Sequence, residues 1–300
     1  MAEILVSGLL NVETSAKVRG FPINYYPIDY AFFGVNTAPG GVGFNLASAL
    51  KRLGSTVTLC GLIADDFGGR YVSSELEKRG ISADAVSCTL AETPSSVVLY
   101  DESGRRQVYC DLKDIQEWTY EFDPALMDRA EIIAATNINF SRPLLKLAKS
   151  AGKKVATDVH VLSDIEDGYN REFMEAADIL FLSHEGIRGD RRAFIFALES
   201  RYKNEIIVLG MGAEGALMYL RDENRFIEMP AFRTDAAVNT VGAGDALFAA
   251  FLNFYGKGFA PVEALERAQM FAALKIRVSG AARGFSTEAE IEGALKNAKR

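Results

Sequence analysis

Residues 239–252 place an acidic side chain between two glycines and an apolar run; they read NTVGAGDALFAAFL. Gly242 and Gly244 let the backbone approach a ligand closely, and the apolar run that follows has the composition of a buried helix. The first turn of a helix has unpaired N–H groups and a partial positive charge, which together bind anions such as phosphate. The pattern predicts an anion site formed by Gly242, Ala243 and Gly244.

Asp245 stands in the first turn of this predicted helix, beside the anion site. A carboxylate repels a phosphate, so Asp245 is not expected to bind the anion. It is suited instead to accept the proton of a hydroxyl group that attacks a phosphoryl group. In a purely structural interpretation, Asp245 complements the helix dipole and the glycines form a tight turn. The local pattern leaves both interpretations open.

Residues 39–45 form a second glycine-rich stretch, PGGVGFN. It lacks the third glycine of a dinucleotide-binding fingerprint and does not follow the first predicted strand, so that fingerprint is disfavoured. A loop that enters a helix remains, with Asn45 one turn in; an amide that both donates and accepts suits a polyhydroxylated ligand. The chain has no GxxxxGK[ST] sequence, which excludes a Walker-type phosphate loop.

The composition of the 300 residues, 49% hydrophobic and 24% charged, is typical of a globular protein. The net charge of −7 argues against a nucleic-acid partner. The longest apolar run is too short to span a bilayer, and the N-terminus lacks the features of a signal peptide. We therefore expect a cytoplasmic protein without a membrane partner. Three widely spaced cysteines and two histidines make a zinc site or a disulfide framework unexpected.

Short apolar strands alternate with amphipathic helices along the chain. This alternation predicts βαβ units and a mostly parallel sheet with helices on both faces. We expect strands at residues 3–7, 56–60, 131–135, 154–157, 178–182 and 205–209, and helices at 43–53, 69–79, 143–150, 169–176, 191–202, 245–255, 262–278 and 287–298. No polar linker or repeat divides the chain, so we predict one domain over residues 1–300.

Two segments, about 11–36 and 95–112, interrupt this alternation with β-forming and aromatic residues. Asp101, Glu102, Ser103 and Gly104 provide a turn signal in the second segment, which predicts a hairpin. We expect the two segments to form a small β-sheet lid that covers the active site or pairs with a second subunit, and a homodimer through the lid is the expected assembly. A surface hairpin without such a role is the alternative.

The motifs of the chain resemble, in the same order, those of the ribokinase family of carbohydrate and nucleoside kinases, also called the PfkB family. The stretch NTVGAGD at 239–245 matches the family signature DTxGAGD except at its first position. The glycines at 40, 41 and 43, with Asn45, are similar to its double-glycine signature. The stretches GLLNVE at 8–13, GLIADDFG at 61–68 and VLGMGAEG at 208–215 resemble three further elements of the family.

The resemblance implies a ribokinase-like three-layer α/β/α fold with a mostly parallel central sheet and a small β-sheet lid. It also implies a phosphotransferase that uses ATP and Mg²⁺ to phosphorylate a hydroxymethyl group of a small sugar. The roles that it implies are a general base, Asp245; an anion hole, Gly242, Ala243 and Gly244; an acceptor site, Asn11, Glu13, Gly40, Gly41 and Asn45; and a nucleotide site, Gly210, Gly212, Gly215, Thr240 and Gly280.

The chain departs from the family pattern at two metal-related positions. Asn239 stands where the family usually has an aspartate that, with the residue at position 241, here Val241, helps bind a monovalent cation. We therefore expect weak or absent activation by potassium. Ser183 and Gly186 replace the Asn and Glu of the family's NxxE motif, which helps place Mg²⁺. Glu185, in a shifted register, is the remaining candidate for a Mg²⁺ ligand.

The identity of the acceptor stays open. Four aromatic residues are candidates to stack on a sugar or a base, or to pack the lid: Tyr25, Tyr26, Phe32 and Phe44. Three arginines, Arg105, Arg106 and Arg142, are candidates to bind a substrate phosphate, or to be solvated. A sugar kinase is our first hypothesis. The alternatives are a nucleoside kinase of the same fold and a non-catalytic sugar or nucleotide sensor.

Overall fold

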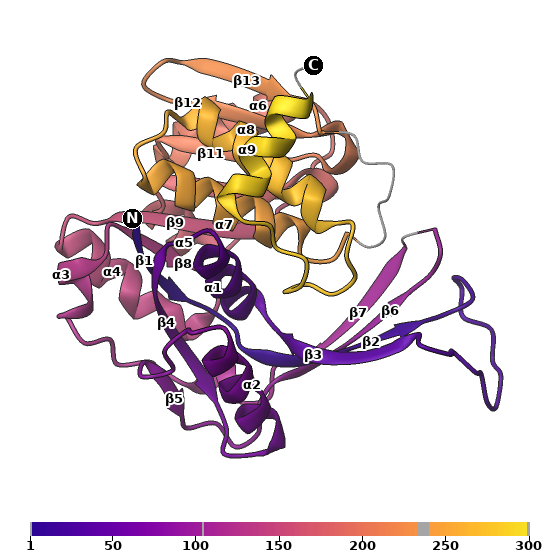
Figure 1. The fold of residues 1–300 in the computed structure, drawn as a ribbon. Coiled ribbons are helices and arrows are strands. Elements are labelled where there is room, and N and C mark those ends of the chain that lie inside the picture. Colours follow the sequence, from indigo (N-terminus) through magenta and orange to yellow (C-terminus); the bar gives the residue numbers. More distant parts are fainter. Residues whose placement is uncertain (1, 104, 233–239, 299–300) are drawn as a thin grey trace.

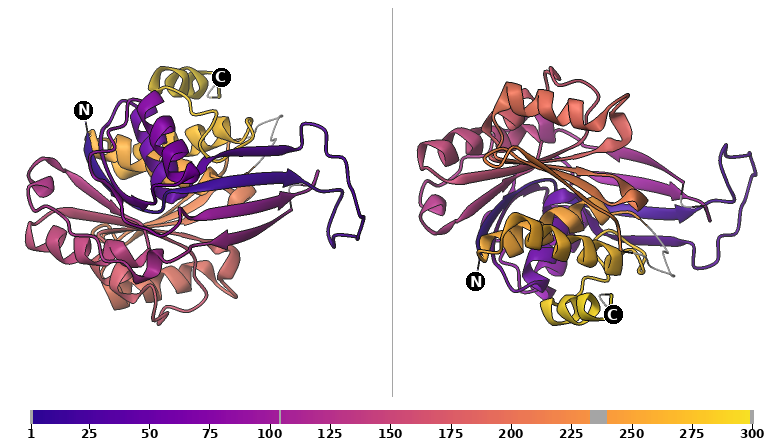
Figure 2. Two further views of the ribbon diagram at one scale, coloured as in Figure 1. Left: turned by 90° about the horizontal axis from the view of Figure 1, so that it is seen from below. Right: turned by 90° about the horizontal axis from the view of Figure 1, so that it is seen from above.

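The computed structural model describes residues 2–103, 105–232 and 240–298. A large sheet lies between two layers of helices, and a smaller sheet projects from one side of it (Figure 1). The two views in Figure 2 show the helices on both faces of the large sheet. The predicted three-layer α/β/α arrangement is therefore confirmed.

In the described ranges, the large sheet has the strand order β13-β12-β11-β10-β9-β8-β1-β4-β5. Its strands are β1 Glu3–Ser7, β4 Thr56–Ile63, β5 Val86–Cys88, β8 Ile132–Ala135, β9 Lys154–Val161, β10 Ile179–Ser183, β11 Ile206–Gly210, β12 Ala216–Leu220 and β13 Arg225–Met229. Along this order, neighbouring strands from β11 through β1 and β4 to β5 pair in parallel. Strand β12 pairs antiparallel with both β11 and β13. The carboxyl ends of the parallel strands meet at one edge, where ligands bind in open α/β sheets.

Each face of the large sheet is covered by its own group of helices, because its strands are apolar on both sides. On one face lie α1 Val42–Arg52, α2 Phe67–Lys78, α7 Ala243–Gly256, α8 Pro261–Lys275 and α9 Glu288–Ala298. On the other face lie α3 Leu126–Arg129, α4 Arg142–Ser150, α5 Arg171–Ala176 and α6 Arg191–Tyr202. All the strands and helices expected from the sequence are present, with ends shifted by a few residues.

Helix α7, which carries the conspicuous glycine–aspartate motif at its start, is anchored in the core. The rings of Phe248 and Phe251 lie 4.9 and 5.3 Å from the ring of Phe181 on β10. Such aromatic pairs contribute about 0.5–1.5 kcal/mol each beyond the apolar area that they bury. The first turn of α7 is thereby held in a fixed position above the sheet.

The two interrupting segments form the smaller sheet, which we call the lid. It consists of β2 Asn11–Lys17, β3 Val35–Gly40, β6 Ser95–Tyr100 and β7 Arg106–Asp111, in the order β3-β2-β6-β7. Strands β6 and β7 form the predicted hairpin, and β2 pairs in parallel with β6. The lid extends away from the helices in all three views (Figures 1 and 2).

The expectation of β structure throughout residues 11–36 is wrong for its middle part. Residues 18–34 join β2 to β3 without a strand and extend beyond the ends of the lid strands (Figure 1). Pro22 and Pro27 have no N–H group to donate to a neighbouring strand. The aromatic side chains of this segment, which led to the expectation, are exposed instead: Tyr25, Tyr26, Tyr30, Phe32 and Phe33.

Candidate active site

The loop before α7 has the geometry of an anion site. Gly242 precedes the helix with φ 76°, and a Cβ atom there would lie 2.7 Å from the carbonyl oxygen of Ala281. This position therefore needs glycine. No described side chain caps the helix N-terminus, and a Cβ atom on the exposed Gly244 would meet nothing within 4 Å. At this helix start the N–H of Ala243 bonds to the carbonyl oxygen of Thr240, whereas Gly244 adjoins open space, as an oxyanion site requires.

Asp245 lies in the first turn of α7 and is held by a residue 200 positions away. The Nδ2 group of Asn45, on α1, donates a hydrogen bond of 2.7 Å to Oδ2 of Asp245. Burial raises the pKa of the Asp245 carboxyl above its ordinary value. His160, Asn45 and Lys275 lower that pKa, whereas the negative charge of Asp158 adds to the increase. A raised pKa suits a group that must accept and later release a proton.

The predicted acceptor residues come together between the lid and α1. Asn11 and Asn45 are 3% and 4% exposed, and each has a buried Oδ1 atom without a hydrogen-bond partner. Gly40 pairs with Asn11 across β3 and β2, and its Cα lies against the side chains of Asn11 and Glu13. Buried amide oxygens without partners are rare. Here they are acceptors available to the hydroxyl groups of a ligand.

Gly41 fixes the path of the chain from the lid to α1. It has φ 87°, and a Cβ atom there would lie 2.3 Å from the carbonyl oxygen of Leu9. Any side chain would therefore push apart the two segments that carry Asn11 and Asn45. Gly41 therefore contributes to the predicted acceptor site by setting the distance between these two segments.

Glu13 extends the group of charges around Asp245. Burial raises the pKa of Glu13, and the negative charge of Asp245 raises it further. The positive charges of Lys275 and Arg106 lower it. Among the described residues, the Glu13 carboxylate has no hydrogen bond or ion pair. It is therefore a charged acceptor without a protein partner, beside the predicted base.

The predicted nucleotide residues lie in two places. Gly210 ends β11, with its carbonyl oxygen 3.1 Å from Nδ1 of His184, and Gly212 and Gly215 lie in the turn that follows. Thr240 precedes the anion loop and is exposed, and its carbonyl oxygen accepts the N–H of Ala243. Gly280 belongs to the segment whose Ala281 packs on Gly242. The structure thus brings Thr240 and Gly280 to the anion loop.

The predicted metal ligands are less well supported. Glu185 is exposed in a short 3-10 helix after β10, and its N–H donates to Oγ of Ser183. Asn239 lies outside the described residues. The carbonyl oxygen of Val241 accepts a hydrogen bond from Nζ of Lys275. In the described ranges, no three His, Cys, Asp or Glu side chains gather as a metal site.

The sequence analysis missed three ionisable residues of this site: Asp158, His160 and Lys275. Asp158 follows the predicted strand at 154–157, so its place at the carboxyl edge of the sheet was a usable signal. Its Oδ1 accepts the N–H of His160, which has φ 57° where the register of β9 and β10 shifts. Backbone strain and bulges of this kind concentrate near functional sites. The signal for Lys275 was a lysine within the apolar stretch FAALKIRV.

The three candidate arginines separate clearly. Arg105 pairs with Asp101 in the lid turn at 2.8 Å, and Arg142 donates to the carbonyl oxygen of Tyr169. Arg106 is exposed on β7, and none of the described hydrogen bonds or ion pairs involves its side chain. Its charge acts on Glu13 and Lys275. Of the three, Arg106 is the one whose charge acts on an acceptor residue, Glu13.

Phe44 is not available to stack on a ligand, so it is excluded as a candidate for stacking. Its side chain is fully buried in the core, with the guanidinium of Arg79 4.9 Å above its ring. Successive residues of a helix project about 100° apart, so Phe44 packs in the core while Asn45 contacts Asp245. Stacking by Tyr25, Tyr26 or Phe32 stays a prediction.

Comparison with known proteins identifies the family. The sequence model of the pfkB family carbohydrate kinases matches residues 1–288. The chain belongs to this family. Among curated members, it is 26% identical over 298 residues to the 5-dehydro-2-deoxygluconokinase of Clostridium perfringens, covering 87% of this chain and 84% of that protein. It is 29% identical over 269 residues to the 2-dehydro-3-deoxygalactonokinase of Haloferax volcanii, covering 80% and 82%.

Solved structures of pfkB-type kinases share the fold. A microbiome-derived acarbose kinase superposes with a TM-score of 0.87 at 24% identity, over 99% of both chains. The ribokinase of Arabidopsis thaliana, solved with ribose and ATP, gives a TM-score of 0.80 at 21% identity over 99% of both chains. The predicted ribokinase-like fold and family are confirmed. Among the described helices, we find none with the length and hydropathy needed to cross a bilayer.

Proposed function

We propose that this pfkB-family protein transfers the γ-phosphoryl group of ATP to a hydroxymethyl group of a small polyhydroxylated acceptor, with Asp245 as the general base. The observation that carries the proposal is the contact between Asp245 and Asn45. It unites a carboxylate of raised pKa, an uncapped helix N-terminus and buried amide oxygens without partners. A proton acceptor, a phosphoryl site and a hydroxyl-binding site are what phosphoryl transfer to an alcohol requires.

The reaction uses these groups in a single displacement. Asp245 accepts the proton of the acceptor hydroxyl as its O–H bond breaks and its oxygen bonds to the γ-phosphorus. The bond from the γ-phosphorus to the bridging oxygen breaks at the same time, and ADP leaves with the electron pair. We expect the N–H group of Gly244 to face the oxygens on which negative charge develops, because the N–H of Ala243 already bonds to Thr240. Asn45 keeps the carboxylate of Asp245 directed toward the acceptor.

The residues present fit a magnesium ion that arrives with the nucleotide. Mg²⁺ in such sites is usually held by one or two carboxylates and by substrate phosphates, rather than by a protein cage. Asp158, within β9, is a carboxylate whose charge acts on Asp245, and Glu185 is the alternative suggested by the sequence. When bound, the ion would neutralise phosphate charge. Asp158 would hold it close to the base.

Arg106 favours an acceptor that carries a negative charge. Its charge acts on Glu13 of the acceptor site and its guanidinium has no described hydrogen bond or ion pair, and arginine binds carboxylate and phosphate well. The relatives that act on a sugar acid, 5-dehydro-2-deoxygluconokinase, and on a sugar phosphate, 1-phosphofructokinase, support the same choice. A nucleoside acceptor is the second candidate, because the exposed aromatic residues 25–33 offer surfaces for stacking.

The test is ADP release with ATP, Mg²⁺ and one acceptor at a time. The panel contains a ketofuranose, a pentose, two deoxy-keto sugar acids, two sugar phosphates and two nucleosides. We expect the highest kcat/KM among the acids or phosphates. Arg106→Ala should raise KM for these acceptors roughly tenfold and leave neutral acceptors unchanged. If no acceptor gives turnover although ATP binds, the sensor hypothesis replaces the kinase.

We also propose that the lid forms a homodimer. The segment 18–34 exposes a group of large apolar side chains, among them Ile28, Tyr30, Phe32 and Phe33. Exposed apolar groups of this size at a sheet edge are usually covered by a partner. Sedimentation at micromolar concentration should give a dimer, and Phe32→Ser with Phe33→Ser should weaken it. A wild-type monomer would contradict this proposal.

A further inference from the structure

Lys275 is a fully buried lysine beneath the anion loop. It ends α8, which packs along α7, and its side chain is 0% exposed. Its Nζ donates a hydrogen bond to the carbonyl oxygen of Val241, one residue before Gly242. A buried lysine without a carboxylate partner is rare, because removing an ammonium group from water is costly. The described ion pairs do not include Lys275, so its position needs another explanation.

The charges around Lys275 belong to the active site. Asp245 on α7 and Glu13 on β2 attract its ammonium group, and Arg106 on β7 repels it. Burial lowers the pKa of Lys275 to about 8. Two buried carboxylates and one ammonium group therefore share this region. The ammonium offsets part of the negative charge that the predicted base brings to a phosphate site.

The same carbonyl oxygen is where the family resemblance places a monovalent cation. Such an ion needs several oxygen ligands, and the carbonyl oxygen of Val241 would be one of them. In this structure, the Lys275 ammonium already bonds to that oxygen. A second positive charge at the same atom would be repelled by the first. The residues present therefore do not fit a free monovalent cation at Val241.

We propose that the ammonium group of Lys275 takes the place of the monovalent cation, as a built-in charge that holds the anion loop beside the transferring phosphoryl group. Lys275 is a positioning residue: it acts through the backbone of Val241 and through its field on Asp245. This inference rests on the proposed phosphotransferase function. It gives a physical reason for the weak potassium activation that Asn239 led us to expect.

The first test measures nucleotide binding, which needs no acceptor. Titration calorimetry with Mg²⁺ and the non-hydrolysable analogue AMP-PNP compares buffers of potassium, sodium and tetramethylammonium chloride. For the wild type, we expect the Kd to agree within about twofold in all three. A potassium-dependent increase in affinity of about tenfold or more would overturn the proposal. This result is independent of whether an acceptor has been found, so it separates failure of the inference from failure of the proposed function.

The second test removes the ammonium group. Lys275→Met keeps the length and apolar stem, and we expect the affinity for AMP-PNP and the kcat to fall by about tenfold or more. Lys275→Ala leaves space for an ion, so ammonium or potassium chloride should restore part of the lost affinity, whereas tetramethylammonium should not. The acid limb of the kcat profile should move to higher pH in Lys275→Met, because a charge that lowers the pKa of Asp245 is lost.

The matched control is Lys257→Met. Lys257 also donates to a backbone carbonyl, that of Leu53, but lies at the other end of α7 and pairs with Glu288. We expect its loss to lower the melting temperature without changing nucleotide affinity or the pH profile. If Lys275→Met and Lys257→Met differ only in stability, Lys275 has a structural role alone and the proposal is wrong. If Lys275→Met does not fold, the wild-type titration still decides.

Discussion

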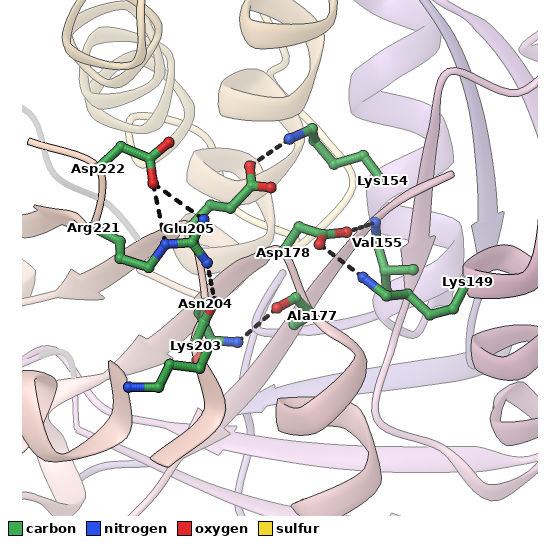
Figure 3. A network of polar contacts seen from close by, with 10 residues as sticks. All are labelled: Lys149, Lys154, Val155, Ala177, Asp178, Lys203, Asn204, Glu205, Arg221 and Asp222. Atoms are coloured by element: carbon green, nitrogen blue, oxygen red, sulfur yellow. Dashed lines mark hydrogen bonds and ion pairs between the residues drawn. The ribbon is translucent and has the colours of Figure 1, made fainter. Parts of the chain in front are cut away.

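Charged side chains at the amino ends of the large sheet form ion pairs, whereas three of those around the candidate active site form none with the described residues. At the amino ends of β9, β10 and β11, a set of residues that we call the amino-end network joins the strands (Figure 3). Lys149 pairs with Asp178 at 2.8 Å, Lys154 with Glu205, and Arg221 with Asp222 at 3.1 Å. On the site side, Lys275 is fully buried and Glu13 and Asp245 are partly buried, and the described ion pairs include none among these three.

This difference suggests that the paired charges serve stability and the unpaired charges serve function. Paired, partly exposed charges contribute little stability each and perturb few pKa values. Buried charges that lie close together without pairing are costly, and they are retained where a ligand completes them. We infer that the amino-end network stabilises the packing of the strands, whereas Glu13, Asp245 and Lys275 contribute to substrate binding and catalysis. Four substitutions test this comparison, from the largest expected effect to the smallest.

Asp245→Asn should have the largest effect of the four, a loss of activity without a loss of stability. We expect kcat to fall by roughly 10²–10⁴-fold, as when a general base is removed. A folded-state pKa above the unfolded value contributes stability at low pH that is lost as the pH rises through it. The variant should therefore melt no lower than the wild type at pH 7. Calorimetry and steady-state kinetics check both statements, and a kcat near that of the wild type would refute the assignment of the base.

Asn204→Ala, at the amino end, should show the opposite result, a loss of stability without a loss of activity. Asn204 is fully buried, and its Nδ2 donates to the carbonyl oxygens of Met174 and Ala177 at 2.9 and 2.7 Å. Its loss leaves both oxygens without that donor, which costs about 1–3 kcal/mol of unfolding free energy. Urea unfolding should show the loss while kcat/KM stays unchanged. A large kinetic effect would mean that the two ends are coupled.

Asn45→Ala should produce a smaller, kinetic effect. The hydrogen bond from Asn45 lowers the pKa of Asp245, so its removal should move the acid limb of the kcat profile to higher pH. The rate depends on the unprotonated carboxylate and is lost as the pH falls through that pKa. The KM for the acceptor should also rise roughly tenfold, since one amide contact is lost. An acid limb that stays in place would show that Asn45 does not act on the base.

Lys149→Met should have the smallest effect. The Lys149 side chain is 46% exposed in its ion pair with Asp178, and the second oxygen of Asp178 remains bonded to the N–H of Val155. We expect the unfolding free energy to change by less than about 0.5 kcal/mol. Thermal melting at low and high salt checks this. A loss as large as that of Asn204→Ala would show that the amino-end network depends on its exposed pairs.

The sequence predicted the elements well because their patterns are local. Apolar strands, helix-spaced residues and the glycines before α7 depend on near neighbours, and so did the choice of Asp245. The contacts that complete the site are not local. The bond from Asn45 to Asp245 and that from Lys275 to Val241 depend on how α1, α7 and α8 pack. The burial of Phe44 and the absence of a strand in residues 18–34 could not be predicted for the same reason, since burial and strand pairing depend on distant partners.

One feature of the acceptor site has a mechanical consequence. Asn11 belongs to the lid, and Asn45 belongs to α1 of the main body. Each offers a buried amide oxygen without a partner. A substrate that bonds to both acts as a reversible crosslink between the lid and α1 of the main body. Its arrival should stiffen the lid, so the slowing of amide hydrogen exchange in β2 and β3 becomes a direct gauge of how well a given acceptor fits.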